Sequence, residues 1–405
     1  MTTALCIVFI LLVPAALAGI SLINTGLGRS RSAAHSMMAA LCVTAVAALA
    51  YFVCGFAWQG FPGGPACVLT VAGKEWNWSG AGPFFLRHFE LDASPAALAV
   101  LLGMFSVSLA ALIPLGAGGD RWRLAASCAS TALLAGWTYP IFAHWAWGGG
   151  WLAQLGFVDA GGSGAIHAVG GLTALSIAWI VGPRRGKYAP DGMPAAIPGH
   201  NTVIVLFGCM LALLGWIGLN AAGAILYTGA PAERIALIGV NTLLAAGSAA
   251  LSAAAITRFR FGRPDASLCA NGWVAGLVSS SAACAVVQPA IAVIIGLVAG
   301  ALIPIAVEWL ELHLSVDDPG GVISVHTVGG VWGLLTVGHW LPQLVGIATL
   351  LGCMLPLTYG VNWIVNRIYP QRVASEGERN GMDLFELGAG AYPEFLTHNE
   401  DFTQR

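Results

Sequence analysis

The chain has 405 residues, of which 57% are hydrophobic and only 9% carry a charge. Soluble domains carry about 25% charged residues, so these values and a mean hydropathy of +0.78 exclude an ordinary soluble protein and indicate a membrane protein with many spans. The formal net charge of −2 gives no sign of nucleic-acid binding.

The first apolar run, residues 3–24, has features of a signal peptide and of a membrane helix. Ala16-Leu17-Ala18 resembles a signal-peptidase site, but no Lys or Arg precedes the run, as is usual at the start of a signal peptide. We therefore expect the run to be retained as the first membrane helix.

Ten further apolar runs follow, each near the length of about 20 residues that crosses a bilayer as a helix. The sequence therefore predicts an all-α polytopic membrane domain, residues 1–366, and a polar tail, residues 367–405. The eleven predicted helices are residues 3–24, 34–59, 94–117, 124–146, 160–182, 202–228, 235–257, 266–286, 289–308, 321–340 and 343–366.

Lys and Arg residues predict the orientation, because loops that face the cytoplasm carry an excess of them. One set of alternate loops, with the tail, carries fourteen of the seventeen basic residues, and the other loops carry only Lys74, Arg87 and Arg234. We therefore expect the tail in the cytoplasm and the N-terminus outside. The fourteen are Arg29, Arg31, Arg121, Arg123, Arg184, Arg185, Lys187, Arg258, Arg260, Arg263, Arg367, Arg372, Arg379 and Arg405.

The pattern Asp-x7-His-x-Val-Gly-Gly occurs twice, from Asp159 to Gly171 and from Asp318 to Gly330. In the predicted topology the two copies run in opposite directions and place both histidines near the middle of the bilayer. Antiparallel copies are typical of inverted repeats, in which the ligand site lies at the interface of the halves. We expect two halves of five helices each, followed by an added eleventh helix.

The two histidines, His167 and His326, are either packing residues or parts of a site. Ionisable residues inside membrane helices are rare and costly, so two at equivalent positions favour a site. The flanking glycines allow helices to approach closely, which would bring the imidazoles together to contact a small polar molecule. No Cys or carboxylate lies at the same depth, and the nine cysteines show no metal-binding spacing, so we expect no metal and no cofactor.

The carboxylate of Asp159 stands at a predicted helix start, where it either caps the helix or adds negative potential to a cation site. Asp317 and Asp318 stand at the matching start of the second copy, and capping alone explains them. Solvated or capping roles are expected for the remaining histidines, His35, His88, His144, His200, His313, His339 and His398.

The two copies resemble the signatures of the ammonium transporter family (Amt/Rh), specifically its Amt branch. Residues 159–167 match the first signature, and residues 317–326, followed by Gly-Gly-Val-Trp-Gly at 329–333, match the second. The resemblance implies an eleven-helix fold, a homotrimer with one hydrophobic pore per subunit, and ammonium or ammonia transport across the plasma membrane. It runs from the first helix to Tyr392, with further matches at residues 140–147, 215–221 and 378–392.

The resemblance also implies roles for individual residues of the pathway. Trp147 would hold ammonium at the outer mouth by cation–π attraction, and Asp159 would support that site from behind. Phe105 matches the outer phenyl gate after a one-residue shift before Gly116. Trp216 would line the pore, and His167 and His326 would form a central relay.

Two positions depart from the family pattern. Leu219 stands where the family has a second gate phenylalanine, and Gly223 stands where it has a serine that hydrogen-bonds the cation. Leucine has no aromatic face and glycine has no hydroxyl, so each loss removes about 1 kcal/mol of recognition. We predict a weaker outer ammonium site than is usual in the family.

The tail departs as well, with Leu387-Gly388-Ala389 in place of a family His-Gly-Glu stretch. The resemblance implies regulation by a PII-type signal protein at this tail, and the alternative is an ordinary solvated tail.

A channel-like ammonium transporter is the favoured function, and an ammonium sensor that binds but conducts poorly is the alternative. A channel for another neutral gas is disfavoured by Trp147 and the Amt-like tail. No nucleophile with a base and no nucleotide-binding loop is apparent, so we do not expect an enzyme.

Overall fold

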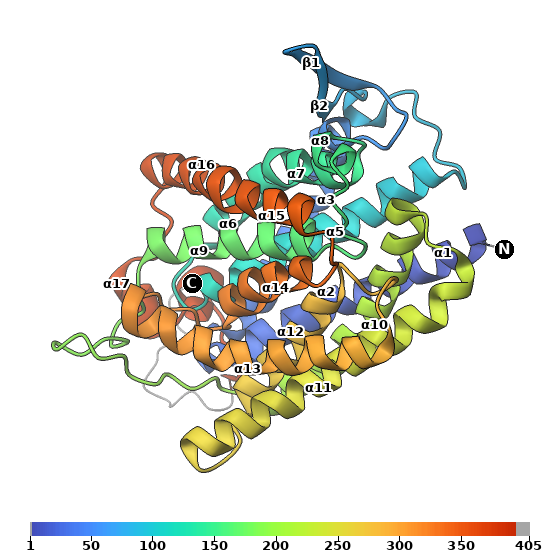
Figure 1. Ribbon diagram of the computed structural model, residues 1–405. Helices are drawn as coiled ribbons and strands as arrows, with labels where there is room; N and C mark the ends of the chain where they lie inside the picture. The colour runs from blue at the N-terminus through green and yellow to red at the C-terminus, as the bar shows by residue number, and fades with distance from the viewer. Residues whose placement is uncertain (1, 394–405) are drawn as a thin grey trace.

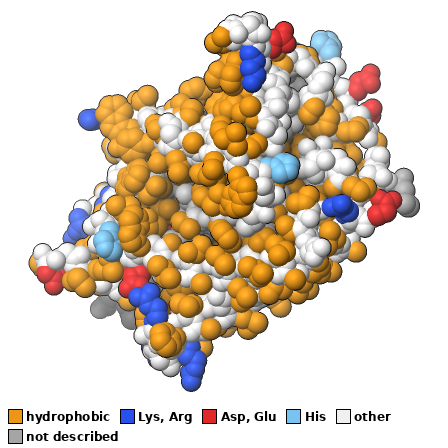
Figure 2. Space-filling view, in the orientation of Figure 1, with side chains coloured by type: hydrophobic (Ala, Val, Ile, Leu, Met, Phe, Trp, Pro, Cys, Tyr) orange, Lys and Arg blue, Asp and Glu red, His pale blue; other side chains and the backbone are white. Residues whose placement is uncertain are grey.

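The structure is a computed structural model and describes residues 2–393. Long helices run alongside one another in a bundle (Figure 1), and apolar side chains cover much of the face seen in Figure 2. Such a surface suits contact with lipid. Eight helical segments among the described residues are long and apolar enough to cross a membrane: Thr2–Leu27, Ser30–Gln59, Pro95–Gly118, Ser163–Val181, Thr202–Thr228, Ala232–Phe261, Pro289–Leu314 and Trp340–Ile368.

Three further helical stretches lie in the remaining predicted ranges. They are residues 124–147, Ala266–Ser280 and the short apolar helix Ile323–Leu335. Every range predicted as a membrane helix is therefore helical over most of its length, and the predicted helical membrane fold is confirmed.

The predicted helix 266–286 ends early, at Ser280. Residues 281–285, which follow the helix, are buried. The carbonyl oxygens of Ser281 and Ala282 accept hydrogen bonds from the N–H groups of Gly161 and Ala160, at 2.8 and 3.3 Å. The prediction of helix to residue 286 was wrong, because apolar composition does not reveal that this backbone pairs with a distant segment. Irregular backbone is tolerated at such depth only where protein buries it.

Several spans contain a π-helical turn, a feature frequent at functional sites. In the first half of the chain the elements are α1 (Thr2–Leu12), α2 (Pro14–Leu27), α3 (Ala33–Ala50), π-turn η2 (Tyr51–Gly55), α4 (Phe56–Gln59), β1 (Ala66–Val71), β2 (Lys74–Gly80), α5 (Pro95–Gly118), α6 (Leu124–Leu133), π-turn η4 (Leu134–Thr138), α7 (Tyr139–Trp147), α8 (Trp151–Gln154), π-turn η5 (Ser163–Ala168) and α9 (Val169–Val181). The second half has α10 (Thr202–Thr228), α11 (Ile235–Phe261), α12 (Ala266–Ser280), α13 (Pro289–Leu314), π-turn η7 (Ile323–Val328), α14 (Gly329–Leu335), α15 (Trp340–Thr349), π-turn η8 (Leu350–Met354), α16 (Leu355–Ile368), α17 (Ser375–Asn380) and π-turn η9 (Asp383–Leu387).

Small residues make the closest helix contacts, as is common in membranes. Along α2 and α10, a Cβ atom on Gly19 would come within 2.6 Å of the carbonyl oxygen of Gly208. The side chains of Ile10, Ala16 and Ile20 are buried in the same core. The first predicted helix therefore packs against the bundle along one face.

A two-stranded antiparallel hairpin, β1–β2, projects from one end of the bundle (Figure 1), which we call the hairpin end. It was not predicted, because its strands are short and exposed. The side chain of Asn77 in β2 contacts Nε2 of His144 at 2.8 Å, and the indole N–H of Trp145 donates to the carbonyl oxygen of Trp78 at 2.7 Å. These bonds fix the hairpin on α7.

The opposite end, which we call the tail end, carries α17 and η9. Asp383 accepts hydrogen bonds from the N–H groups of Ala34 and His35, at 3.2 and 2.8 Å, and so caps α3. Glu386 pairs with the His35 ring at 2.8 Å and accepts from the N–H of Leu124 at 2.9 Å. Glu378 is only 2% exposed. The described part of the tail is therefore docked on the bundle, and the alternative of a solvated tail was wrong for these residues; His398 and Arg405 lie outside the described residues.

Buried ion pairs also hold the tail end together. Arg184 donates to both carboxylate oxygens of Asp317, from Nε and Nη2 at 2.9 Å, and to Asp120 at 3.1 Å. Burial raises the pKa of the Asp317 carboxyl, but bonds from Arg184 and the charges of Arg121 and Arg184 outweigh it, so the pKa lies below its usual value. Arg121 and Arg184, which the sequence analysis counted only as loop charges, therefore also stabilise the structure through ion pairs.

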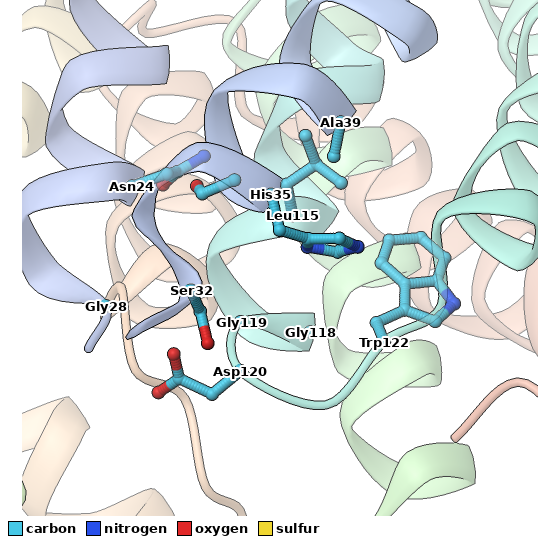
Figure 3. A pocket seen from close by; sticks show the side chains of 11 residues that line it. Asn24, Gly28, Ser32, His35, Ala39, Leu115, Gly118, Gly119, Asp120 and Trp122 are labelled. Carbon is cyan, nitrogen blue, oxygen red and sulfur yellow. The ribbon is translucent and has the colours of Figure 1, made fainter. Parts of the chain in front are cut away.

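A cavity of about 20 Å³ lies between α2, α3 and α5 at the tail end (Figure 3). Asn24, Ser32, His35, Asp120 and Trp122 are among its lining residues. The volume suits about one water molecule. The cavity therefore belongs to the polar packing beneath the docked tail.

Candidate functional site

Each Asp-to-His segment begins with the same local structure. A glycine takes a left-handed backbone conformation, at Gly162 (φ 91°) and at Gly321 (φ 64°), and a π-helical turn follows that contains the histidine. Residues with a Cβ atom rarely adopt such φ values, so glycine is needed at both positions. The spacing of the motif therefore produces two copies of one structural element.

The two copies run in opposite directions through the bundle. Arg184, just after the end of α9, donates its backbone N–H to the carboxylate of Asp317, just before η7, at 2.8 Å. The end of the first copy thus lies beside the start of the second. A Cβ atom on Gly171 would come within 2.7 Å of the backbone nitrogen of Thr327, and one on Gly330 within 3.2 Å of that of Ala168. These glycines let each copy pack directly on the other.

The two imidazole rings lie side by side at this crossing. Their centroids are 5.3 Å apart with an angle of 32° between the planes, and His167 and His326 are 0% and 1% exposed. Trp216 of α10 stacks on His167, with centroids 4.9 Å apart and planes within 12°. The indole N–H of Trp216 donates to the hydroxyl of Ser281 at 3.2 Å, which fixes the orientation of this ring.

The rings offer unused hydrogen-bonding groups. Within residues 2–393, the two ring nitrogens of His167 have no hydrogen-bond partner, and Nδ1 of His326 has none. A neutral imidazole carries one donor and one acceptor nitrogen, and buried polar groups are nearly always paired. The arrangement can therefore bind a small molecule that both donates and accepts hydrogen bonds.

Trp147 and Asp159 lie together toward the hairpin end. The indole N–H of Trp147 donates to the backbone carbonyl of Asp159 at 2.7 Å. The Asp159 carboxylate is 1% exposed and accepts from the N–H groups of Gly162, Gly164 and Ala165, at 3.1, 3.0 and 2.9 Å. Its oxygens thus face the start of the π-turn. This is the capping geometry, one of the two roles that the sequence suggested for Asp159.

Leu219 and Gly223, which we expect to depart from the family pattern, lie on one face of α10. Leu219 is 1% exposed and packs in the main core. A Cβ atom on Gly223 would clash with the carbonyl oxygen of Ala160, so this position has no room for a side chain in the present backbone. Phe105 of α5 is partly buried, and no ring contact in the described part of the chain joins it to Trp147 or Trp216.

The structure adds Tyr227 to these residues, which sequence analysis missed. Its ring stacks on Trp147 with centroids 4.3 Å apart and planes within 2°. Leu219, Gly223 and Tyr227 are spaced by four residues and therefore share one helix face. That spacing could have identified Tyr227 from the sequence, whereas nothing in the local sequence marks the contact of Ser281 with Trp216.

Two of the other histidines are buried, so the solvated alternative was wrong for them, while the capping alternative was not. His144 is 1% exposed, and its Nδ1 contacts the backbone carbonyl of Gln59 at 2.7 Å. His35 is 6% exposed and pairs with Glu386. His88, His313 and His339 are exposed, in line with the expectation.

Comparison with known proteins gives a consistent match. The profile of the Ammonium Transporter Family matches residues 4–392. Ammonium transporter Amt2 of Archaeoglobus fulgidus is 34% identical over 416 aligned positions, which cover 94% of this chain and 85% of the relative. An ammonium transporter of Bacillus subtilis is 28% identical, with 93% and 95% covered.

Solved structures match over nearly the whole chain. A structure described as a sensor Amt protein has a TM-score of 0.86 at 29% identity and covers 95% of this chain and 98% of its own. Mep2 of Candida albicans has a TM-score of 0.81 at 24% identity, covers 97% and 90%, and supports the fold alone.

Proposed function

This chain belongs to the ammonium transporter family and is a multi-pass membrane protein that transports ammonium; from that premise we propose that the nitrogen passes between His167 and His326. The observation that carries the proposal is the pair of buried rings, 5.3 Å apart, with unpaired nitrogens among the described residues. These groups match ammonia, which both donates and accepts hydrogen bonds.

The apolar surroundings favour passage without the intact cation. Moving an unpaired cation into an apolar interior costs several kcal/mol or more, and neutral ammonia costs far less. Trp216, Leu219 and the packed core around the rings provide such surroundings. We therefore infer that the proton separates from ammonia before the histidines, and that the imidazoles can relay it.

The remaining pathway residues have supporting roles in this proposal. Trp147 faces the incoming cation near the hairpin end, and Asp159 holds the start of η5 while contributing negative charge. Phe105 is the proposed outer gate, and Trp216 orients His167. Leu219 and Gly223 lie on the same face of α10 as Tyr227, whose ring stacks on Trp147. At the positions of Leu219 and Gly223 the family pattern has a phenylalanine and a serine.

We further propose the full topology. All eleven helical stretches cross the membrane, as two antiparallel halves of five with an added eleventh helix. The excess of basic residues in the tail-end loops supports an orientation with the tail end in the cytoplasm and the hairpin end outside the plasma membrane. Residues 1–366 form the membrane domain, and residues 367–405 form the cytoplasmic tail.

The proposal includes assembly and regulation. The exposed apolar helix faces support a homotrimer with one pore per subunit. The docked residues of the tail lie where a PII-type signal protein would approach from the cytoplasm. The alternative function is an ammonium sensor, and the match to a structure described as a sensor Amt protein gives it a specific basis.

The decisive experiment is to record current from the purified full chain in liposomes during an ammonium pulse. We expect the current to fall at least about 100-fold in the His167→Ala/His326→Ala double variant. A thermal unfolding measurement should show that this variant is still folded. Uptake without any current would support passage of neutral gas, and binding with neither would support the sensor. An undiminished current in the double variant would contradict the histidine pathway.

A further inference from the structure

An apolar cavity of about 270 Å³ opens at the hairpin end, where two membrane spans end. One span, Ser30–Gln59, finishes with α4, and the next, Pro95–Gly118, is α5. The cavity lies between these two ends and the segments beside them, and it is not part of the ammonium pathway proposed above. The side chains of Phe56, Phe61, Pro62, Pro83, Phe89 and Ala96 are among those that line it.

The lining offers no polar side chain. It consists only of phenylalanine, proline, alanine and glycine residues, and several of the prolines and glycines are exposed at the surface. Apolar cavities stay free of ordered water, and one of about 150 Å³ already binds benzene. The present cavity therefore suits a larger apolar group that enters from the surface.

Aromatic rings connect the cavity to the surface of the bundle that faces the bilayer. The ring of Phe56 contacts that of Phe89, with centroids 5.3 Å apart, and Phe52, one turn earlier in the same span, contacts Phe85 at 6.0 Å. Phe52 is 37% exposed although it lies inside a membrane span. The rings of Phe84 and Phe85 are exposed beside it. An apolar guest can thus come directly from the bilayer.

The segment beside the cavity has an unusual backbone. Phe85, Leu86 and His88 take left-handed conformations, with φ values of 61°, 49° and 58°. Residues with a Cβ atom rarely adopt such values, and strain of this kind clusters at ligand sites. The segment belongs to the connection from β2 to α5 (Figure 1) and lies between two lining residues, Pro83 and Phe89. Its side chains are therefore held next to the cavity.

Arg87 provides a positive charge in the same segment. Its guanidinium lies 5.6 Å from the centroid of the Phe85 ring, and its side chain is exposed. The ion pairs within residues 2–393 do not include Arg87, although the exposed Glu90 is near in the sequence. Guanidinium groups bind phosphate through parallel N–H donors. A phosphate-binding group two residues from the lining residue Phe89 matches the two parts of a phospholipid.

We propose that the cavity binds an acyl chain of a phospholipid from the leaflet at the hairpin end, while Arg87 binds its phosphate. The depth agrees, since the headgroups of a bilayer lie where membrane spans end. Charge and apolar surface follow the order of the lipid, with Arg87 in the exposed segment and Phe56 at the end of the span. This inference uses the membrane location of the chain and is independent of the histidine pathway.

The test uses the full chain in phosphatidylcholine liposomes with a trace of phosphatidylcholine that carries a photoreactive diazirine in the upper part of one acyl chain. After illumination, mass spectrometry of peptides locates the labelled residues. We expect residues 56–65 and 82–96 to be labelled at least about fivefold more than the exposed face of α13, which corresponds to a preference of about 1 kcal/mol over bulk lipid contact.

A variant that fills the cavity tests whether the chain enters it. Ala96→Phe adds a ring at the α5 wall and should lower the labelling of this site to the level of α13. Ala93→Phe is the matched control, because Ala93 is exposed and does not line the cavity. Thermal unfolding should show that both variants are folded. Labelling that survives Ala96→Phe unchanged would overturn the assignment of the cavity.

A diacylglycerol with the same photoreactive chain lacks the phosphate and isolates the role of Arg87. We expect phosphatidylcholine to label the site about threefold more than this diacylglycerol, and both to label it equally in Arg87→Gln, as suits an exposed charge pair. Lys74→Gln is the matched control, because the Lys74 ammonium lies over Trp76 and neither residue lines the cavity. An unchanged ratio in Arg87→Gln would overturn the assignment of the phosphate to Arg87.

Other occupants of this surface give different results. Labelling of the site no stronger than that of α13 would mean that lipid only surrounds the protein here, and the inference would fail. Crosslinks from residues 84–91 to a second copy of the chain, in place of lipid, would also overturn it. The current of the double histidine variant tests the ammonium pathway separately, so each proposal can fail alone.

Discussion

In the first Asp-to-His segment the Asp159 carboxylate accepts three backbone hydrogen bonds, whereas in the second Asp318 accepts one, from Ile323 at 2.7 Å. The second segment has instead the neighbouring Asp317, which binds Arg184. The first segment is thus stabilised by hydrogen bonds within itself, at the hairpin end. The second is stabilised by ion pairs with residues distant in the sequence, at the tail end. The repeat determines where the histidines lie, and the surroundings determine what holds each one.

The rings differ in the same way. His167 is stacked on Trp216, while in the described part of the chain the only ring paired with His326 is His167 itself. The two histidines are therefore equivalent in the sequence but not in the site, and we expect variants in the two segments to have unequal effects.

The largest effect is expected from Arg184→Met. It leaves the buried carboxylate of Asp317 without its main partner, and breaking a buried ion pair costs about 3–5 kcal/mol. Thermal unfolding of the purified protein in detergent should show the loss. Arg185→Met is the matched control, because the Arg185 side chain is 51% exposed and its ion pair with Glu378 is long, at 3.9 Å, while Glu378 keeps its closer partner Arg372 at 2.8 Å. Equal stability of the two variants would show that the tail end does not hold the second segment.

The next effect separates the two aspartates. Asp159→Ala leaves three buried N–H groups without an acceptor and should destabilise the protein by about 3 kcal/mol, whereas Asp318→Ala removes one such bond and should cost about 1 kcal/mol. Denaturant titration of both variants under the same conditions measures the difference. Equal losses would contradict the unequal capping of the two segments.

The helical ranges and the pairing of the histidines could be predicted from the sequence, because apolar length and a repeated motif report burial and symmetry directly. The early end of the helix at Ser280 could not, since it depends on backbone bonds to residues 160–161. The position of Tyr227 follows from helical spacing on α10, but its stacking on Trp147 depends on the packing of α10 against the end of α7, which the local sequence does not reveal.

A smaller effect tests the asymmetry of the rings. Trp216→Leu removes the ring that stacks on His167, and such aromatic pairs contribute about 0.5–1.5 kcal/mol. We expect the maximal ammonium current to fall about threefold to tenfold, with little change in half-saturation. Trp332→Leu is the control, because its indole donates to the carbonyl of Ile295 and its ring pairs with neither histidine ring among the described residues. A current lowered equally by both variants would point to general packing.

The smallest effect concerns the tail beneath the second segment. Burial raises the pKa of the Glu386 carboxyl, but hydrogen bonds from His35 and the N–H of Leu124, with the nearby positive charges, lower it below its ordinary value of 4.5. A depressed pKa means that the ionised carboxylate stabilises the docked tail above the unfolded-state pKa, and that this contribution is lost as the pH falls through the lower folded-state value.

Glu386→Gln should therefore lower stability by about 1 kcal/mol at pH 7, and the difference from wild type should shrink as the pH falls below the ordinary value of 4.5 and through the lower folded-state pKa. Thermal unfolding at stepped pH values measures it, and limited proteolysis of the tail shows whether docking is lost. Glu376→Gln is the matched control, because Glu376 is exposed on the same helix as Glu378. A difference that persists unchanged well below pH 4.5 would mean that Glu386 acts through its shape and not through its charge.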